Sequence, residues 1–276
     1  MSRLRFTKMH GAGNDFVILD RLAGAPFPDA ALARRLADRH TGVGCDQIMV
    51  IEPALDAGHA FRYRILNADG STAGQCGNGA RCVAAYLRQH HGLSEGALLD
   101  SPGDSVAVHF LAGGEIELAL GVPRLNPEEV PFVAEQSSTR HELEVLGRRV
   151  GIAALSMGNP HAVLQVSEVA TAPVAELGAA IERHPRFPDR ANVGFVQIVD
   201  RKHVRLRVWE RGVGETLACG SGACAAVVAL RLTEAVDEQV AVDLPGGRLQ
   251  VRWSGPGTPV YLSGPAITVF EGEFCL

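Results

Sequence analysis

Two cysteine motifs in the chain have nearly the same sequence. One reads Cys76-Gly77-Asn78-Gly79-Ala80-Arg81-Cys82, and the other reads Cys219-Gly220-Ser221-Gly222-Ala223-Cys224. Each runs into a segment rich in Ala, Val and Leu, so we expect its first cysteine to stand at the start of a helix. Free backbone N–H groups and the helix dipole favour anions there. We therefore expect the pKa of both thiols to fall from about 8.5 toward neutrality.

A pair of such thiols could invert a stereocentre by proton transfer. This reaction needs a base on one face of a carbon and an acid on the other, and the two thiols would exchange roles at each turnover. The same helix starts could hold a carboxylate and the charge that develops as the proton leaves. One cysteine before Gly-x-Gly is more often structural, but two copies favour Cys76 and Cys219 as an acid–base pair.

The spacing of the two motifs indicates how the chain is organised. They are 219 − 76 = 143 residues apart in a chain of 276 residues. A repeat at half the chain length indicates two similar halves related by a pseudo-twofold axis, with a site in the cleft between them. We place the boundary near 121–127. Residues 1–121 then form the N-terminal half, to which 265–276 return, and residues 122–264 form the C-terminal half.

Short strands and a few helices should position the motifs, which predicts a mixed α/β fold. Strands are indicated by β-branched, apolar or alternating runs between turn residues: 61–67, 106–111, 115–120, 162–166, 193–199, 204–209, 249–253 and 266–270. Helices are predicted at 28–39, 76–89, 173–183 and 219–230.

Composition excludes several classes of function. The chain is 46% hydrophobic with a net charge of −5 and 5% aromatic residues, and it has no basic run, which argues against nucleic acid as a partner. No apolar stretch has the length of a membrane span or a signal peptide, so we expect a cytoplasmic protein without a membrane partner. Lys8 and Lys202, the two lysines, do not suit a pyridoxal Schiff base.

The remaining cysteines and the paired histidines do not indicate a metal site. Cys45, Cys82, Cys224 and Cys275 form no CxxC motif and are interpreted as small buried apolar residues. His90-His91 precedes Gly92 and is interpreted as the end of a helix.

Several motifs together resemble the diaminopimelate epimerase family over nearly the whole chain. They are Met9 to Phe16 (MHGAGNDF), Gly42 to Gln47 (GVGCDQ), Asn67 to Ser71 (NADGS), Gly158 to His161 (GNPH), Ala191 to Phe195 (ANVGF) and Trp209 to Thr216 (WERGVGET). The resemblance implies two pseudo-symmetric halves, each a mostly antiparallel sheet wrapped around a central helix. It also implies a cofactor-independent homodimer that converts LL-diaminopimelate to the meso form for lysine and peptidoglycan synthesis.

The resemblance also assigns roles to individual residues. Cys76 and Cys219 would be the acid–base pair, with His161 and Glu210 beside them biasing their protonation. Substrate would be bound by Asn14, Gln47, Asn67, Asn159, Asn192 and Arg211, and by backbone donors at Gly77-Asn78 and Gly220-Ser221. Ser221 stands where the family often has Thr. The residue types agree with these roles, because the planar fork of Arg211 suits a distal carboxylate. Taken singly, each Asn could instead shape a turn, and His161 could cap a strand.

Three other functions are compatible with parts of the sequence. A proline or hydroxyproline racemase would share the two thiols but has less need of Arg211. An isomerase of the same fold would lack the thiol pair. A non-catalytic amino-acid-binding or redox-sensing protein could use the cysteines as a disulfide switch, and it would not exchange a substrate α-proton in deuterated water.

Overall fold

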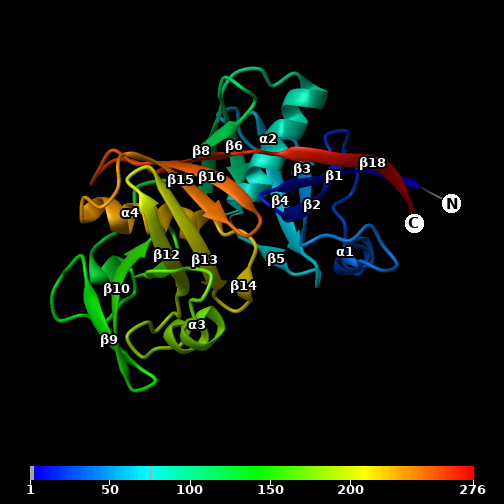
Figure 1. Cartoon of the computed structure of the whole chain (residues 1–276). Coiled ribbons are helices and arrows are strands. Elements are labelled where there is room, and N and C mark those ends of the chain that lie inside the picture. Colours follow the sequence, from blue (N-terminus) through cyan, green and yellow to red (C-terminus); the bar gives the residue numbers. More distant parts are fainter. Residues whose placement is uncertain (1–2, 75, 103) are drawn as a thin grey trace. The chain divides into compact units, whose positions relative to one another are not determined.

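The computed structural model describes residues 3–74, 76–102 and 104–276. The chain divides into two compact units. Unit 1 comprises Met1–Ala119 and Gly264–Leu276, and unit 2 comprises Leu120–Ser263. Figure 1 shows the helices and strands of both units.

Unit 1 is a sheet around one long helix. Its elements are β1 (Arg3–Gly11), β2 (Asn14–Asp20), α1 (Ala30–Ala37), β3 (Gln47–Glu52), β4 (Phe61–Asn67), β5 (Thr72–Ala73), α2 (Gly77–His91), β6 (Ala97–Ser101), β7 (Asp104–Phe110), β8 (Ile116–Ala119) and β18 (Ile267–Cys275). The strand order is β18-β1-β2-β3-β4-β6-β7-β8, with β5 paired to β4. The β2/β3 and β4/β6 pairs are parallel and the others are antiparallel.

Small residues let this sheet wrap closely around α2. The helix contacts β1, β2, β3, β7 and β8. Ala80, Cys82, Val83, Ala84 and Leu87 are buried on it. A Cβ at Gly79 would lie 2.7 Å from the Met49 side chain, so glycine permits the close approach there. The helix ends at Gly92 in the left-handed conformation after His90 and His91, as the sequence predicted.

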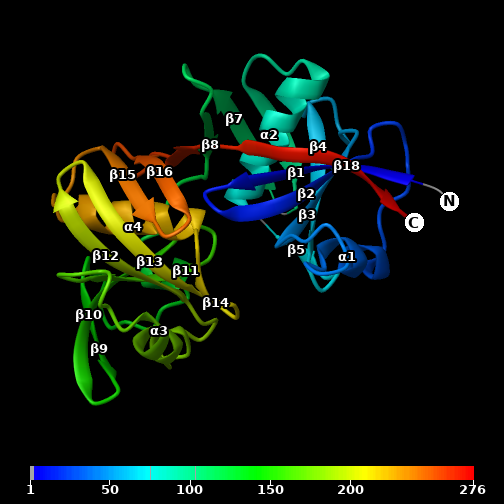
Figure 2. The same ribbon diagram turned by 45° about the vertical axis from the view of Figure 1, so that its right-hand side comes forward.

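Unit 2 repeats the same plan. Its elements are η1 (Pro127–Glu129), β9 (His141–Val145), β10 (Arg148–Ser156), β11 (Pro160–Gln165), α3 (Val174–Glu182), β12 (Asn192–Asp200), β13 (His203–Glu210), β14 (Gly214–Thr216), α4 (Gly220–Leu232), β15 (Gln239–Leu244), β16 (Gly247–Arg252) and β17 (Tyr261–Gly264). The helix α4 is buried from Gly222 to Leu230 and packs against β10, β11, β12, β13 and β16 (Figure 2).

Strand order and orientation are the same in the two units. In unit 2 the order is β9-β10-β11-β12-β13-β15-β16-β17, and the parallel pairs are β11/β12 and β13/β15. Each position matches its counterpart in unit 1, with α4 in the place of α2. The predicted mixed α/β class, dominated by strands with few helices, is confirmed.

Candidate functional site

Both predicted cysteines stand at helix starts. Cys76 is the N-cap of α2, and its Sγ accepts a hydrogen bond of 3.4 Å from the backbone N–H of Gly79. Cys219 is the N-cap of α4. Both have extended backbones, which turn the chain into the helix and leave the first-turn N–H groups without intrahelical partners. Gly77-Asn78 and Gly220-Ser221 fill those first turns, so both pairs could donate to an anion.

The strand topology of unit 1 gathers three predicted residues at one end of the sheet. The parallel strands β2 and β3 begin at Asn14 and Gln47, and the antiparallel β4 ends at Asn67, directly opposite Gln47. The Gln47 amide donates to Asn67 Oδ1 at 3.0 Å. Asn14 lies beside the cysteine, because the Cys76 thiol donates to Asn14 Oδ1 at 3.7 Å.

An ionic network that the sequence analysis missed sets the orientation of Asn14. Asp46 Oδ2 accepts the Asn14 amide at 2.7 Å, so the amide oxygen faces Cys76. Arg39 joins Asp46 to Asp15 with contacts of 2.7 and 2.8 Å. Burial raises the pKa of Asp15, but hydrogen bonds, chiefly from Arg39, outweigh it and hold the pKa well below its usual range. The sequence offered one sign of this network: Asp15 directly follows Asn14, and Asp46 directly precedes Gln47.

Unit 2 gathers its residues at the equivalent end of its sheet. The parallel strands β11 and β12 place His161 opposite Asn192. Asn159 Oδ1 lies 3.0 Å from His161 Nε2. Asn192 donates to the Pro160 carbonyl at 3.2 Å and accepts from the Arg211 backbone N–H at 3.0 Å. The structure thus brings these predicted residues into one hydrogen-bonded group at the strand ends.

The environment of Cys219 corrects one prediction. Its side chain is buried, and its thiol hydrogen-bonds to the Glu210 carboxyl group and lies 3.6 Å from Ser221 Oγ. Burial and then the charge of Glu210 raise the pKa of Cys219 far above its usual range. The predicted fall of this pKa is therefore wrong, because loss of solvation and a neighbouring carboxylate outweigh the helix start. Burial also raises the pKa of Glu210 and outweighs the hydrogen bond that Thr216 donates to its carboxylate, which lowers that pKa.

Equal spacing shows that Glu210 and Asn67 occupy equivalent positions. Asn67 precedes Cys76 by 76 − 67 = 9 residues, and Glu210 precedes Cys219 by 219 − 210 = 9 residues. Asn67 ends β4 and Glu210 ends β13, and in each unit one short strand, β5 or β14, follows before the cysteine. The two frameworks are therefore alike, but the residue at this position is a neutral amide in unit 1 and an acid in unit 2.

His161 is held in its neutral form. It is 1% exposed, and burial together with the charge of Arg211 lowers its pKa to about 3. A neutral imidazole can accept one hydrogen bond and donate another without adding charge to the site. The guanidinium of Arg211 is exposed and donates to the Asp189 carbonyl at 2.9 Å, which leaves further N–H donors for a ligand.

The buried His161 should make the free protein less stable in acid. An unfolded chain takes up the proton near pH 6.5, whereas the folded state resists protonation down to about pH 3. The folded state therefore keeps its full free energy of unfolding above pH 6.5, and it loses stability as the pH falls below 6.5 because only the unfolded chain binds the proton. We expect the free energy of unfolding to drop by about 2 kcal/mol more in the wild type than in His161→Gln between pH 7 and 5. Urea unfolding at both pH values measures this; parallel losses would contradict it.

The other four cysteines were predicted to be buried. Cys45, Cys82 and Cys224 are buried, and burial raises the pKa of Cys45 and of Cys82 to about 12, so their thiols are unreactive. The prediction is wrong for Cys275, which is exposed. Cys275 ends β18 one residue before the last of the chain, and no packing covers it.

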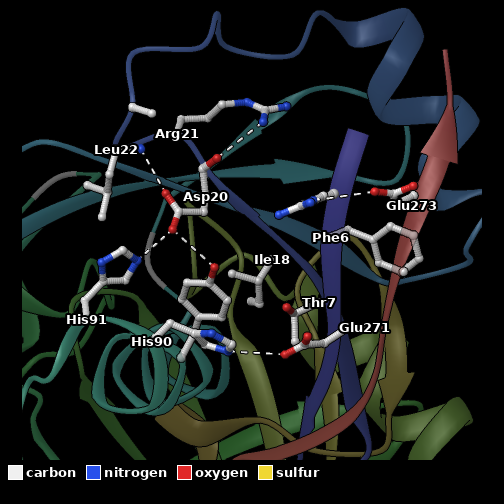
Figure 3. A pocket seen from close by; sticks show the side chains of 14 residues that line it. Phe6, Thr7, Ile18, Asp20, Arg21, Leu22, His90, His91, Glu271 and Glu273 are labelled. Atoms are coloured by element: carbon white, nitrogen blue, oxygen red, sulfur yellow. Dashed lines mark hydrogen bonds and ion pairs between the residues drawn. The ribbon is translucent and has the colours of Figure 1, made fainter. Parts of the chain in front are cut away.

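A surface pocket of about 750 Å³ lies elsewhere on unit 1 (Figure 3). It is lined by residues of β1, β2 and β18 and by His90 and His91 at the end of α2. The helix is 15 residues long, so this pocket lies about 20 Å from the helix start at Cys76. None of the sequence-predicted site residues lines it.

The described residues, 3–74, 76–102 and 104–276, show neither a metal-binding cluster nor a membrane-spanning helix. They hold no group of three or more His, Cys, Asp and Glu side chains suited to a metal ion. None of their helices is long and apolar enough to cross a membrane.

Comparison with known proteins identifies close relatives. Residues 6–125 and 153–269 match the family model of diaminopimelate epimerase. The diaminopimelate epimerase of Xanthomonas euvesicatoria pv. vesicatoria is 55% identical over 274 residues, which cover 99% of this chain and 96% of that protein. The diaminopimelate epimerase of Stutzerimonas stutzeri is 51% identical over 271 residues, 98% of each chain.

Solved structures show the same fold at low identity. A PhzF-family phenazine biosynthesis protein from Bacillus anthracis has a TM-score of 0.73 and 15% identity, with 100% of each chain covered. A hydroxyproline epimerase from Agrobacterium vitis with bound trans-4-hydroxy-L-proline has a TM-score of 0.67 and 17% identity, covering 98% of this chain and 92% of that one.

Proposed function

The chain belongs to the diaminopimelate epimerase family, and from this premise we propose that it converts LL-diaminopimelate to meso-diaminopimelate in lysine and peptidoglycan biosynthesis. Cys76 and Cys219 act as the two acid–base groups, one on each face of the reacting α-carbon. One observation carries this mechanism. A cysteine is the N-cap of the central helix in both units, and the two units have the same strand order. Because the thiols perform both proton transfers, the reaction needs no cofactor.

We propose that the two thiols start in different states. Burial and Glu210 favour the protonated form of Cys219, so it serves as the acid when LL-diaminopimelate reacts. The equivalent neighbour of Cys76 is the neutral Asn67, and the Gly79 N–H donates to the Cys76 sulfur, so Cys76 gives up the proton that it shares with Asn14 more readily than Cys219 gives up its own. Cys76 then removes the α-proton as thiolate, and Cys219 protonates the opposite face. The roles reverse for the meso substrate, because the reaction is reversible.

The substrate ends are assigned to different groups. First-turn N–H groups of α2 and α4 stabilise the carboxylate at the reacting carbon and the charge that develops on it. Asn14, Gln47, Asn67, Asn159 and Asn192 bind the polar groups of the substrate. Arg211 binds the distal carboxylate, which its exposed guanidinium can engage with two parallel hydrogen bonds.

Replacing Arg211 with Lys should weaken substrate binding strongly. The charge remains, but the bidentate fork is lost. We expect the Kd for diaminopimelate to rise by a factor of about 30, equivalent to about 2 kcal/mol, while thermal stability stays near that of the wild type. Isothermal titration calorimetry measures the effect, with the exposed Arg205→Lys on β13 as control. An unchanged Kd would show that Arg211 does not hold the distal end.

Proline or hydroxyproline is the alternative substrate, and the Agrobacterium vitis structure supports it through fold alone. One assay separates the candidates: epimerisation of LL-diaminopimelate and of L-proline in deuterated water, followed by polarimetry and mass spectrometry. We expect inverted diaminopimelate carrying deuterium at the α-carbon and no change in proline. Turnover of proline alone would replace the proposed substrate. Absence of exchange in both would reject an epimerase.

We also propose a homodimer that works in the cytoplasm. Support for association comes from Ile267, Val269 and Phe270 on β18, which are exposed apolar side chains grouped on one strand. Sedimentation of the wild type at the mass of one chain would reject the dimer.

The proposed cytoplasmic location follows from the chemistry, because both thiols must stay reduced to carry protons. Periplasmic recovery after cell fractionation would reject it.

A further inference from the structure

Glu182, the last residue of α3, is a buried acid for which the proposed mechanism has no use. Its side chain is 4% exposed. Acidic side chains are rarely buried this deeply unless they are paired. The position is also unfavourable, because the C-terminal end of a helix repels negative charge. Arg190 pairs with Glu182 Oε1 at 3.7 Å, and the hydrogen bonds of Glu182 must supply the rest of the compensation for its burial.

The Glu182 carboxylate accepts two hydrogen bonds, from the residues on either side of the dipeptide Glu210-Arg211. Glu182 Oε2 accepts the indole N–H of Trp209 at 2.8 Å, and Oε1 accepts the backbone N–H of Gly212 at 2.9 Å. Trp209 and Gly212 flank Glu210 and Arg211 in the sequence. One carboxylate thus fixes the chain immediately before and immediately after the two residues.

The helix α3 is shaped to receive this segment. Gly178 lies one turn before Glu182, and a Cβ there would lie 2.6 Å from the Cβ of Trp209. The absence of a side chain at Gly178 therefore lets Trp209 pack directly on the helix, within reach of Glu182.

A second path leads from Glu182 to Arg211. The main-chain carbonyl of Glu182 accepts the N–H of Ala191 at 3.1 Å. The next residue, Asn192, accepts the backbone N–H of Arg211 through its side chain at 3.0 Å. Arg211 is thus held through Gly212 by the carboxylate of Glu182 and through Asn192 by its main chain, and only the first path depends on the Glu182 side chain.

We propose that Glu182 is a positioning residue that sets Arg211 for the distal carboxylate of the substrate, an inference that rests on the proposed function. The effect should fall on binding and not on proton transfer. Glu210 has separate support, since it accepts from Thr216 and pairs with Gly214 in the β13–β14 ladder. Arg211 lies in the turn beyond that ladder and depends on the contacts that start at Glu182.

Glu182→Gln tests this with little change in shape. Trp209 and Gly212 donate to different oxygens of the carboxylate, and the amide replaces one of those oxygens with an NH2 group that cannot accept. We expect KM for LL-diaminopimelate to rise about tenfold while kcat stays within about threefold of the wild type. Trp209→Phe keeps the packing, removes one donor and should raise KM in the same direction; it replaces Glu182→Gln if that variant does not fold. Glu176→Gln, exposed on the same helix, is the matched control and should change neither constant.

A double variant distinguishes positioning from a general structural effect. If Glu182 acts through Arg211, Glu182→Gln should raise KM little further in the Arg211→Lys background. An unchanged KM in a folded Glu182→Gln variant would overturn the inference, and so would increases in KM that multiply in the double variant. In either case turnover of diaminopimelate by the wild type would still support the proposed function. A wild type without turnover of diaminopimelate would overturn both.

Discussion

Cys76→Ala and Cys219→Ala should each lower epimerisation of diaminopimelate by at least about 10³-fold. Each substitution removes the proton donor or acceptor from one face of the α-carbon, and general acid–base groups contribute about 10²–10⁴-fold apiece. The remaining thiol can move a proton on its own face but cannot complete the inversion. Optical rotation followed from LL-diaminopimelate, and separately from the meso form, measures both directions.

Each helix supplies a matched control for its own cysteine. Cys82 lies in α2 and Cys224 in α4, both fully buried away from the helix starts. Their alanine variants should retain activity within a few-fold and lose only a little stability. Turnover near the wild-type rate in either Cys76→Ala or Cys219→Ala would reject the two-base mechanism. Loss of activity in a folded Cys82→Ala or Cys224→Ala would show that the reactive thiols were misidentified.

The sequence predicted the two helix starts because their signal is local. Cys-Gly-x-Gly followed by an Ala-rich run determines a helix N-terminus within a few residues, and Cys76 and Cys219 are the N-caps of α2 and α4. The strand predicted at 61–67 coincides with β4 for the same reason: its alternating apolar residues lie between turn residues.

Elements whose stability depends on distant residues could not be predicted in the same way. The first strand, β1, was not predicted, and it is completed by β18 from the other end of the chain, with Arg3 opposite Cys275. The ionic network that orients Asn14 joins Asp15 to Asp46 and Arg39 across β2 and the loop before β3. The return of 265–276 to the N-terminal half was expected, but the local patterns of 3–11 and 39–46 did not indicate β1 or the ionic contacts of Asp15 and Asp46.

The protonation of Cys219 was predicted wrongly because burial is a property of the folded chain. The helix-start argument counts the dipole and the free N–H groups, worth about 0.3–1 kcal/mol near an exposed helix end. The loss of solvation depends on how closely α4 packs on its sheet, and it exceeds that contribution at Cys219. The family resemblance assigned His161 and Glu210 to the neighbourhood of the cysteines; the structure shows Glu210 next to Cys219 and gives the direction of its effect on the pKa of that thiol.

Glu210→Gln should reduce epimerisation most at alkaline pH. Burial and the charge of Glu210 raise the pKa of Cys219, so removal of that charge lowers the pKa. The proposed acid must carry its proton when LL-diaminopimelate reacts, and it would lose that proton at lower pH in the variant. The alkaline limb of the kcat/KM profile should therefore move to lower pH. We expect a loss on the order of a hundredfold on that limb, within the range of acid–base contributions.

Thiol labelling shows whether this loss arises at Cys219. In the free enzyme, iodoacetamide should modify Cys219 faster in Glu210→Gln than in the wild type at one alkaline pH, because a larger share of the thiol is ionised. Peptide mapping assigns the label to Cys219. Glu215→Gln is the matched control, since Glu215 lies on the adjacent β14 and pairs with Arg207. Slower labelling of Cys219 in Glu210→Gln, or an alkaline limb displaced to higher pH, would mean that Glu210 promotes the thiolate and that Cys219 starts as the base.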